Sequence, residues 1–180
     1  ALVVSVVGLV VELNRAPTAA ERGRAAAEEV ARRWRTWPAG NIFPATVPYT
    51  LEVGGRESAR RVGIDPGRDC GAAVDAPLRV PLRTHGCLAV LRATYLDQLQ
   101  GLAITIGVVA FPDERTAVQA AGRLPAGDKA VPGLRALAFP GTETGRFGDA
   151  ARQVGAVRHR GPYVVLATIG YTDGRPAAET

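Results

Sequence analysis

The chain of 180 residues carries 22 lysine and arginine residues against 17 aspartate and glutamate residues, which gives a formal net charge of +5 at pH 7. With 47% hydrophobic and 22% charged residues, its composition is that of an ordinary globular protein and excludes a disordered or collagen-like chain. Its length suits one domain with a hydrophobic core. The cationic residues are scattered among the acids without a long run of like charges, which argues against a nucleic acid partner.

Residues 1–11 form an uncharged, apolar run that is shorter than the about 20 residues a membrane-spanning helix needs. The sequence contains no methionine, so we expect its translated start to be missing and residues 1–15 to be the remnant of a membrane anchor in the lipid bilayer. A buried, valine-rich strand is the alternative. Arg15, Arg22 and Arg24 argue against a body outside the cytoplasm, because basic residues that flank an anchor tend to stay inside.

Residues 16–38 are predicted to form a long amphipathic helix. Thr18 and Glu21 have the spacing of a capping box, in which each side chain bonds the backbone amide of the other residue. Alanine-rich sequence follows, and Pro38 ends the helix. One face is apolar, and we expect it to pack on the domain that follows: Ala27, Val30, Ala31 and Trp34.

Residues 39–180 are predicted to form a single α+β domain. Its first elements are expected to be a short strand at residues 49–54 and a short helix at residues 56–63 that Gly63 closes. A further short helix is expected within residues 76–86, where a proline suits the first turn and a glycine suits the end.

The middle of the domain predicts an antiparallel hairpin with strands at residues 87–96 and 101–111. Both stretches are rich in β-branched and aliphatic residues, and a short turn separates them. Residues 112–124 predict an amphipathic helix with Asp113 as its N-cap. Its expected apolar face consists of Ala117, Val118, Ala121 and Leu124.

The last third predicts more strand than helix. Residues 134–139 are expected to form a strand, and residues 146–153 a helical turn or two. Residues 154–174 predict two strands that turn at Arg160 and Gly161. Taken together, the elements predict an α+β fold with an antiparallel sheet and helices packed on one face, preceded by a long N-terminal helix.

The cysteines and histidines of the chain are Cys70, Cys87, His85 and His159. They lack the paired, short spacing of a zinc site, so no metal is expected. A thiol nucleophile with His159 as its base remains open. We favour a disulfide between Cys70 and Cys87, because no cysteine is spare and closing the loop between them would stabilise a protein in an oxidising compartment. The alternative is a reduced pair in a cytosolic protein.

The familiar catalytic and cofactor motifs do not occur: the sequence has no phosphate-binding loop, dinucleotide fingerprint, nucleophile elbow or zinc-protease motif, and no cofactor is expected. A small basic turn at Arg158, His159 and Arg160 is the candidate contact for an anionic ligand or partner. Strand alternation would place the two arginines on one face and the histidine on the other. A solvated hairpin end is the alternative.

The order of features resembles the membrane-tethered extracytoplasmic domains of uncharacterised actinobacterial proteins. The resemblance covers the whole chain and rests on the hydrophobic lead, the alanine- and arginine-rich helix, the junction at residues 37–49 and the body with two cysteines. It implies that the body lies on the extracytoplasmic side of the cell membrane and binds a ligand or partner.

Three functions are therefore expected in order of preference. The first is a membrane-anchored extracytoplasmic domain without enzymatic activity that binds a ligand or partner. The second is an enzyme, for example a hydrolase, whose acid, arginine and His159 side chains meet only in three dimensions. The third is a subunit of a membrane assembly with the N-terminal helix as its protein-docking element.

Overall fold

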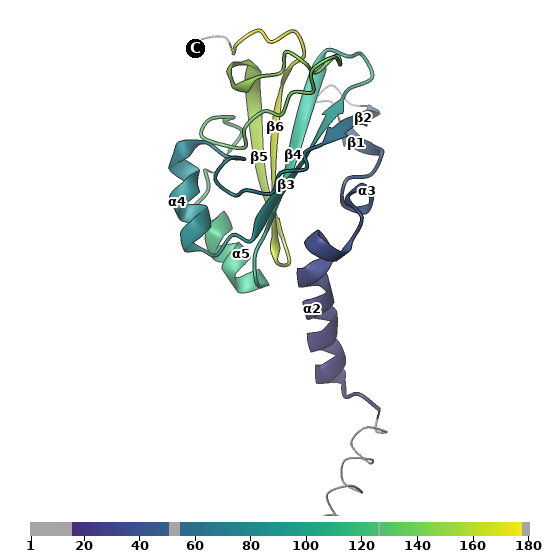
Figure 1. The fold of residues 1–180 in the computed structure, drawn as a ribbon, viewed down its shortest axis with the longest axis vertical. Helices are drawn as coiled ribbons and strands as arrows, with labels where there is room; N and C mark the ends of the chain where they lie inside the picture. Colours follow the sequence, from purple (N-terminus) through teal and green to yellow (C-terminus); the bar gives the residue numbers. More distant parts are fainter. Residues whose placement is uncertain (1–15, 51–54, 126, 178–180) are drawn as a thin grey trace, which may run out of the picture. The chain divides into compact units, whose positions relative to one another are not determined.

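The computed structural model of the protein describes residues 16–50, 55–125 and 127–177 (Figure 1). By its internal contacts the chain divides into two compact units, Ala1–Val30 and Ala31–Thr180. The expected anchor remnant at residues 1–15 lies outside the described residues. Among the helices that are described, none combines the length and the apolar character that crossing a bilayer requires.

The predicted N-terminal helix is present as α2 (Ala19–Thr36). Its capping box is confirmed, because the Thr18 N–H donates to Glu21 Oε2 at 2.8 Å and the Glu21 N–H donates to Thr18 Oγ1 at 3.3 Å. The end of the helix belongs to the second unit. There Trp34 packs against core residues of the sheet, and its N–H donates to Tyr163 Oη at 3.2 Å. A single helical turn, α3 (Ala39–Ile42), follows.

The body is built on one antiparallel sheet of six strands in the order β1-β2-β3-β4-β6-β5, which confirms the α+β prediction. The predicted hairpins appear as the pairs β3–β4 and β5–β6, and the pairing of β4 with β6 joins them. The strands are β1 (Thr46–Thr50), β2 (Arg56–Ile64), β3 (Ala89–Leu96), β4 (Leu102–Ala110), β5 (Arg152–Arg160) and β6 (Tyr163–Tyr171).

The two faces of the sheet bury different partners, because side chains alternate along each strand. One face carries Val90, Val109 and Val164, and the helices α4 (Ala76–Thr84) and α5 (Glu114–Ala121) cover it (Figure 1). The opposite face carries an aromatic and aliphatic cluster that the chain between α2 and β1 covers. That cluster includes Trp34, Ile42, Phe43, Leu91, Ala93, Tyr95 and Ile104.

Helix α5 forms where the sequence predicts it. The Asp113 carboxylate accepts from the Thr116 N–H at 2.8 Å, as expected of an N-cap. Ala117 and Ala120 face the core, whereas Val118, which was predicted to lie on the buried face, is half exposed. The apolar stripe is therefore rotated by part of a turn from the predicted one.

The prediction of a helix at residues 56–63 is wrong, because this stretch forms strand β2. Partners on both sides account for the difference, since β2 pairs with β1 and with β3. An isolated helix of two turns is marginal, so pairing on both sides overrides the local preference. Gly63 is not a helix cap but lies beneath the Phe139 ring, where any Cβ would collide. The neighbouring strand prediction, residues 49–54, overlaps β1 at its start, and residues 51–54 lie outside the described residues.

The predicted strand at residues 134–139 is also wrong. These residues belong to the crossing segment (residues 129–139), which makes an isolated bridge with the edge strand β5 between Lys129 and Val154 and otherwise runs over the sheet face. Leu134 makes only an isolated bridge, with Val74. The Leu137 N–H donates to Thr105 Oγ1 at 3.1 Å, and its carbonyl accepts from the Thr94 hydroxyl at 2.7 Å. Side chains of the sheet thus replace a neighbouring strand as hydrogen-bond partners.

Small residues on the sheet make room for the crossing segment. Gly155 of β5 lies under Lys129, Gly107 of β4 under Leu134 and Gly63 of β2 under Phe139. A Cβ on Gly155 would meet the Lys129 carbonyl at 2.5 Å. The segment therefore crosses the sheet from β5 to β2 in direct contact with its backbone. It leads to the 3-10 helix η1 (Asp149–Ala151), which corresponds to the predicted helical turn.

Candidate functional site

The predicted disulfide between Cys70 and Cys87 is present, with an S–S distance of 2.08 Å, and the described residues include no free cysteine. The bond ties the loop that follows β2 to the chain that follows α4. Oxidised sulfur atoms are not thiolates, so the alternative of a thiol nucleophile does not apply to this form of the protein.

Beside the disulfide lies a hollow of about 870 Å³, which we call the arginine hollow. Both cysteines contribute to its lining. Its charged side chains come from three separate parts of the chain: Arg68, Asp69, Arg79, Arg83 and Arg135. Four cations surround one acid in this hollow, so its lining is strongly basic.

The loop after β2 holds Arg68 in place through a series of short-range bonds. The Asp65 carboxylate accepts from both Nε and a terminal nitrogen of Arg92, at 3.1 and 2.6 Å, and from the Gly67 N–H at 2.8 Å. The Arg68 carbonyl accepts from the Val90 N–H at the start of β3. Two residues later the disulfide fixes the loop again. Its backbone is thus anchored on both sides of Arg68.

Helix α4 supplies Arg79 and Arg83, which are one turn apart and exposed. Leu78 and Leu82 are buried in the core, and this burial turns the two arginines toward the solvent side. The aliphatic part of the Arg79 side chain runs close to Gly71, whose Cβ would meet Arg79 Cδ at 3.8 Å. The helix thus places two guanidinium groups along one wall of the hollow.

Arg135 reaches the hollow from the crossing segment. Its backbone N–H donates to the Ala73 carbonyl at 2.9 Å, and its Nε donates to Asp149 Oδ2 at 2.8 Å. Hydrogen bonding and the charge of Asp149 raise the pKa of Arg135 above its ordinary value. The guanidinium is therefore oriented by an acid outside the hollow and keeps its positive charge there.

The other three arginines have no such acid. No other described residue forms a hydrogen bond or ion pair with the guanidinium group of Arg68, Arg79 or Arg83. The one acid of the lining, Asp69, uses its Oδ1 to accept from the Ala72 N–H at 2.6 Å. The hollow therefore has uncompensated positive charge and free N–H donors, which is the chemistry that an anionic ligand requires.

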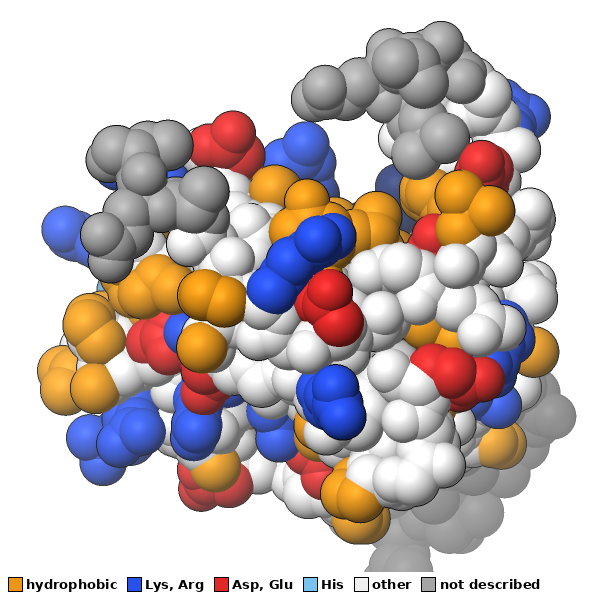
Figure 2. Space-filling model, turned by 90° about the horizontal axis from the view of Figure 1, so that it is seen from above, with side chains coloured by type: hydrophobic (Ala, Val, Ile, Leu, Met, Phe, Trp, Pro, Cys, Tyr) orange, Lys and Arg blue, Asp and Glu red, His pale blue; other side chains and the backbone are white. Residues whose placement is uncertain are grey.

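At least one face of the molecule carries no such concentration of charge (Figure 2). Figure 2 shows a face on which acidic, basic and apolar side chains lie interspersed, without a field of one sign. On this face the charges are mixed, in line with the scattered charges of the sequence.

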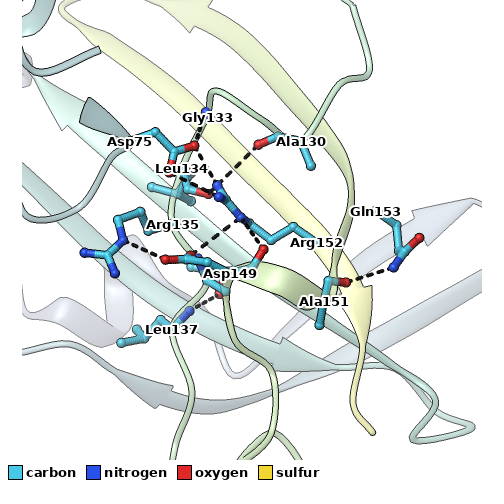
Figure 3. Close-up of polar contacts among 12 residues, drawn as sticks. Asp75, Ala130, Gly133, Leu134, Arg135, Leu137, Asp149, Ala151, Arg152 and Gln153 are labelled. Atoms are coloured by element: carbon cyan, nitrogen blue, oxygen red, sulfur yellow. Dashed lines mark hydrogen bonds and ion pairs between the residues drawn. The ribbon is translucent and has the colours of Figure 1, made fainter. Parts of the chain in front are cut away.

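A second charged cluster is buried and has a structural role (Figure 3). The side chain of Arg152 is only 4% exposed and bonds both oxygens of Asp75, at 2.9 and 3.1 Å. It also donates to the carbonyls of Asp149, Leu134 and Ala130. Since protein groups occupy these donors, we assign the cluster to holding β5, α4 and the crossing segment together and not to binding a ligand.

The basic turn that the sequence singled out lies at the exposed end of β5. Arg158 donates to the Val157 carbonyl at 2.9 Å, and the Gly161 carbonyl accepts from His159 Nε2 at 2.8 Å. A hollow of about 370 Å³ beside it includes Arg158 and His159 but shares no lining residue with the arginine hollow. The structure therefore keeps this turn separate from the main concentration of charge.

A smaller hollow of about 170 Å³ adjoins the loop that carries Arg68, and we call it the tryptophan hollow. Its main side chains are Trp34, Trp37, Ile42, Phe43, Asp65 and Arg68. Arg68 therefore lines both the tryptophan hollow and the arginine hollow.

The described residues contain no candidate metal site. No three of their His, Cys, Asp or Glu side chains are grouped so that they could hold an ion. His85 ends helix α4 and does not line the arginine hollow.

The class that fold and site define is an antiparallel α+β domain closed by one disulfide, with a basic hollow beside it. No protein-family model matches the chain, and neither a curated protein nor a solved structure matches it. Function must therefore be argued from the site itself.

Proposed function

We propose that the protein is a membrane-anchored domain on the extracytoplasmic side of the cell membrane that binds an anionic ligand or partner through the arginine hollow, without catalysing a reaction. The observation that carries the binding role is the set of four guanidinium groups around one hollow, three of which have no acid partner among the described residues.

The location is supported by two features of the chain. Disulfides persist in oxidising compartments, which in bacteria lie outside the cytoplasm, and this bond joins the only two cysteines of the sequence. The apolar run at residues 1–11 would hold the domain at the bilayer.

The chemistry of the hollow supports binding better than catalysis. An arginine side chain stays protonated at physiological pH and presents its donors in a planar fork that fits carboxylate or phosphate oxygens. It neither gives nor takes a proton in an ordinary acid–base step. Arginines grouped in this way can bind an anion through several charge-assisted hydrogen bonds at once.

The test compares two charge-matched double variants in calorimetric titrations with inorganic pyrophosphate. We expect Arg79→Gln with Arg83→Gln to weaken binding at least about tenfold, because each charge-assisted hydrogen bond contributes about 1.5 kcal/mol or more. The control, Arg158→Gln with Arg160→Gln, removes the same charge at the basic turn and should change affinity less than about twofold.

Equal weakening by the two double variants would show general charge attraction and overturn the assignment of the hollow. Failure of the unaltered protein to bind pyrophosphate at low salt would do the same, since electrostatic binding is strongest there.

A further inference from the structure

The arginine hollow does not end at Arg68, because the same side chain lines the tryptophan hollow. The loop of residues 65–72 separates the two hollows and contributes side chains to both. A ligand bound by Arg68 in one hollow is therefore in reach of the other. This continuity raises the question of which molecule has parts that suit both.

Apart from Asp65 and Arg68, the tryptophan hollow is lined by aromatic and aliphatic side chains. Trp37 is 38% exposed, and one of its faces carries the Arg33 guanidinium at 4.4 Å from the ring centre. Trp34 and Phe43 belong to the core cluster behind it and hold the wall in place. Rigid aromatic surfaces of this kind favour the flat apolar face of a ring over a flexible group.

Each hollow also contains one carboxylate. Asp65 lines the tryptophan hollow, and Asp69 lines the arginine hollow. Among the described residues no donor bonds Asp69 Oδ2. A carboxylate accepts hydrogen bonds only, so it suits a ligand that brings hydroxyl donors along with its anionic groups.

We infer that the two hollows form one extended site for a glycan chain with anionic substituents. A sugar ring lies against the indole of Trp37 and its neighbours, hydroxyl groups donate to Asp69, and carboxylate or phosphate substituents accept from Arg68, Arg79 and Arg83. The inference rests on the proposed function, because it requires the arginine hollow to bind anions.

Two other polyanions fit less well. A nucleic acid has closely spaced phosphates that Asp69 would repel, and the site lacks the row of exposed aromatic side chains on which successive bases stack. The acyl chains of an anionic lipid would leave Asp69 Oδ2 without a donor, because among the described residues only its Oδ1 is bonded.

The test measures the affinities of the full chain for four probes at one salt concentration. The probes are an oligogalacturonide and a heparin oligosaccharide, a polyphosphate of matched charge, and vesicles of phosphatidylglycerol. We expect the better of the two glycans to bind about tenfold tighter than polyphosphate, since stacking and hydroxyl contacts add to the ionic ones.

Variants separate the two parts of the site. Trp37→Ala should remove most of the tenfold glycan advantage while polyphosphate binding stays within about twofold. Leu99→Ala is the control, because Leu99 is 84% exposed and lies in neither hollow. Circular dichroism of both variants checks that the fold is retained, and Trp37→Phe should restore part of the glycan affinity.

The outcomes are distinct. Polyphosphate binding as tight as that of both glycans, or a glycan advantage that survives Trp37→Ala, overturns the extended site and leaves the arginine hollow as proposed. Preference for a single-stranded oligonucleotide, added as a fifth probe, overturns the glycan in favour of that class. Preference for the vesicles does so when Arg79→Gln with Arg83→Gln removes it, because insertion of the apolar run at residues 1–11 would not depend on these arginines. Loss of binding to every probe overturns the proposed function together with this inference.

Discussion

Arg152 is the side chain on which several parts of the fold depend. It lies at the start of β5, and its guanidinium bonds Asp75 at the N-cap of α4 and two carbonyls of the crossing segment. Asp75 in turn accepts from the Gly133 N–H at 2.8 Å. A buried charge costs free energy unless it is paired and hydrogen-bonded, and here both conditions are met.

Replacing Arg152 by alanine is expected to lower the free energy of unfolding by about 3 to 5 kcal/mol, because Asp75 would lose its charged partner and the carbonyls would remain buried without their donor. Urea denaturation followed by circular dichroism measures the change. The control is Arg60→Ala, which breaks the ion pair with Glu143 at the surface, where both side chains are more than 40% exposed, and should cost less than about 1 kcal/mol. Similar losses for the two variants would contradict the structural role of the cluster.

The same cluster predicts a pH dependence. Burial raises the pKa of the Asp75 carboxyl, but the hydrogen bonds and charge of Arg152 and the Gly133 amide outweigh it and hold the pKa below its ordinary value of 3.8. The ionised form is thus stabilised by folding, and this contribution is present above the unfolded pKa and lost as pH falls through the lowered one.

Asp75→Asn is therefore expected to be less stable than the unaltered protein near neutral pH, and the difference should shrink as pH falls below about 4. Urea denaturation at a series of pH values measures it. Glu143→Gln on the surface serves as the control. A difference that stays constant down to pH 2 would show that the Asp75 charge does not contribute.

Among the elements, the crossing segment has the least ordinary position. It lies flat on the sheet because glycines and threonines form the surface beneath it, and threonine hydroxyls bond its backbone. Farther along, the Ala151 carbonyl at the end of η1 and the Phe147 ring press against Gly170 of β6. Side chains larger than hydrogen at these glycines would push the segment off the sheet.

Gly170→Ala is accordingly expected to destabilise the fold by about 1 to 3 kcal/mol, since the new methyl group would meet the Ala151 backbone and not a flexible side chain. The midpoint of thermal unfolding reports the change. Gly101→Ala is a matched control, because nothing lies within 4 Å of a Cβ there. If Gly101→Ala alone lost stability, or if both variants lost the same amount, the close packing of η1 against Gly170 would be refuted.

The sequence predicts those elements whose patterns are local. The capping box of α2, the N-cap of α5 and the hairpins β3–β4 and β5–β6 each depend on neighbours within a few residues, and all are present. Strand β2 and the crossing segment depend instead on distant partners. Nothing within residues 56–63 reveals that β3 will pair with them, and nothing within residues 134–139 reveals the threonines below.

The candidate site divides in the same way. The disulfide could be predicted, because counting two cysteines leaves one pairing. The arginine hollow could not, since Arg68 and Arg135 are distant in sequence and meet only through the path of the crossing segment. One local signal was available: Arg79 and Arg83 are spaced one helical turn apart on α4, and no acid of that helix pairs with them.

At the scale of the whole molecule, the disulfide links the fold to its compartment. Protein taken from its native source without reductant should resist alkylation of Cys70 and Cys87 until reduced, and its mass should be two hydrogen atoms lower than that of the reduced chain. Intact-mass spectrometry before and after reduction measures both. Free alkylation of both cysteines under denaturing, non-reducing conditions would place the body in the cytoplasm, as the arginines after the apolar run would favour.

The strand order also sets when the site can exist during folding. The two hairpins form from neighbouring residues, but the pairing of β4 with β6 closes a long loop, and only then is there a complete surface for the crossing segment to settle on. Arg135 belongs to that segment, so the arginine hollow is complete only when the crossing segment is in place. Partly folded chains would therefore lack the complete site. A ligand that needs the complete site would bind only fully folded molecules and would stabilise only them.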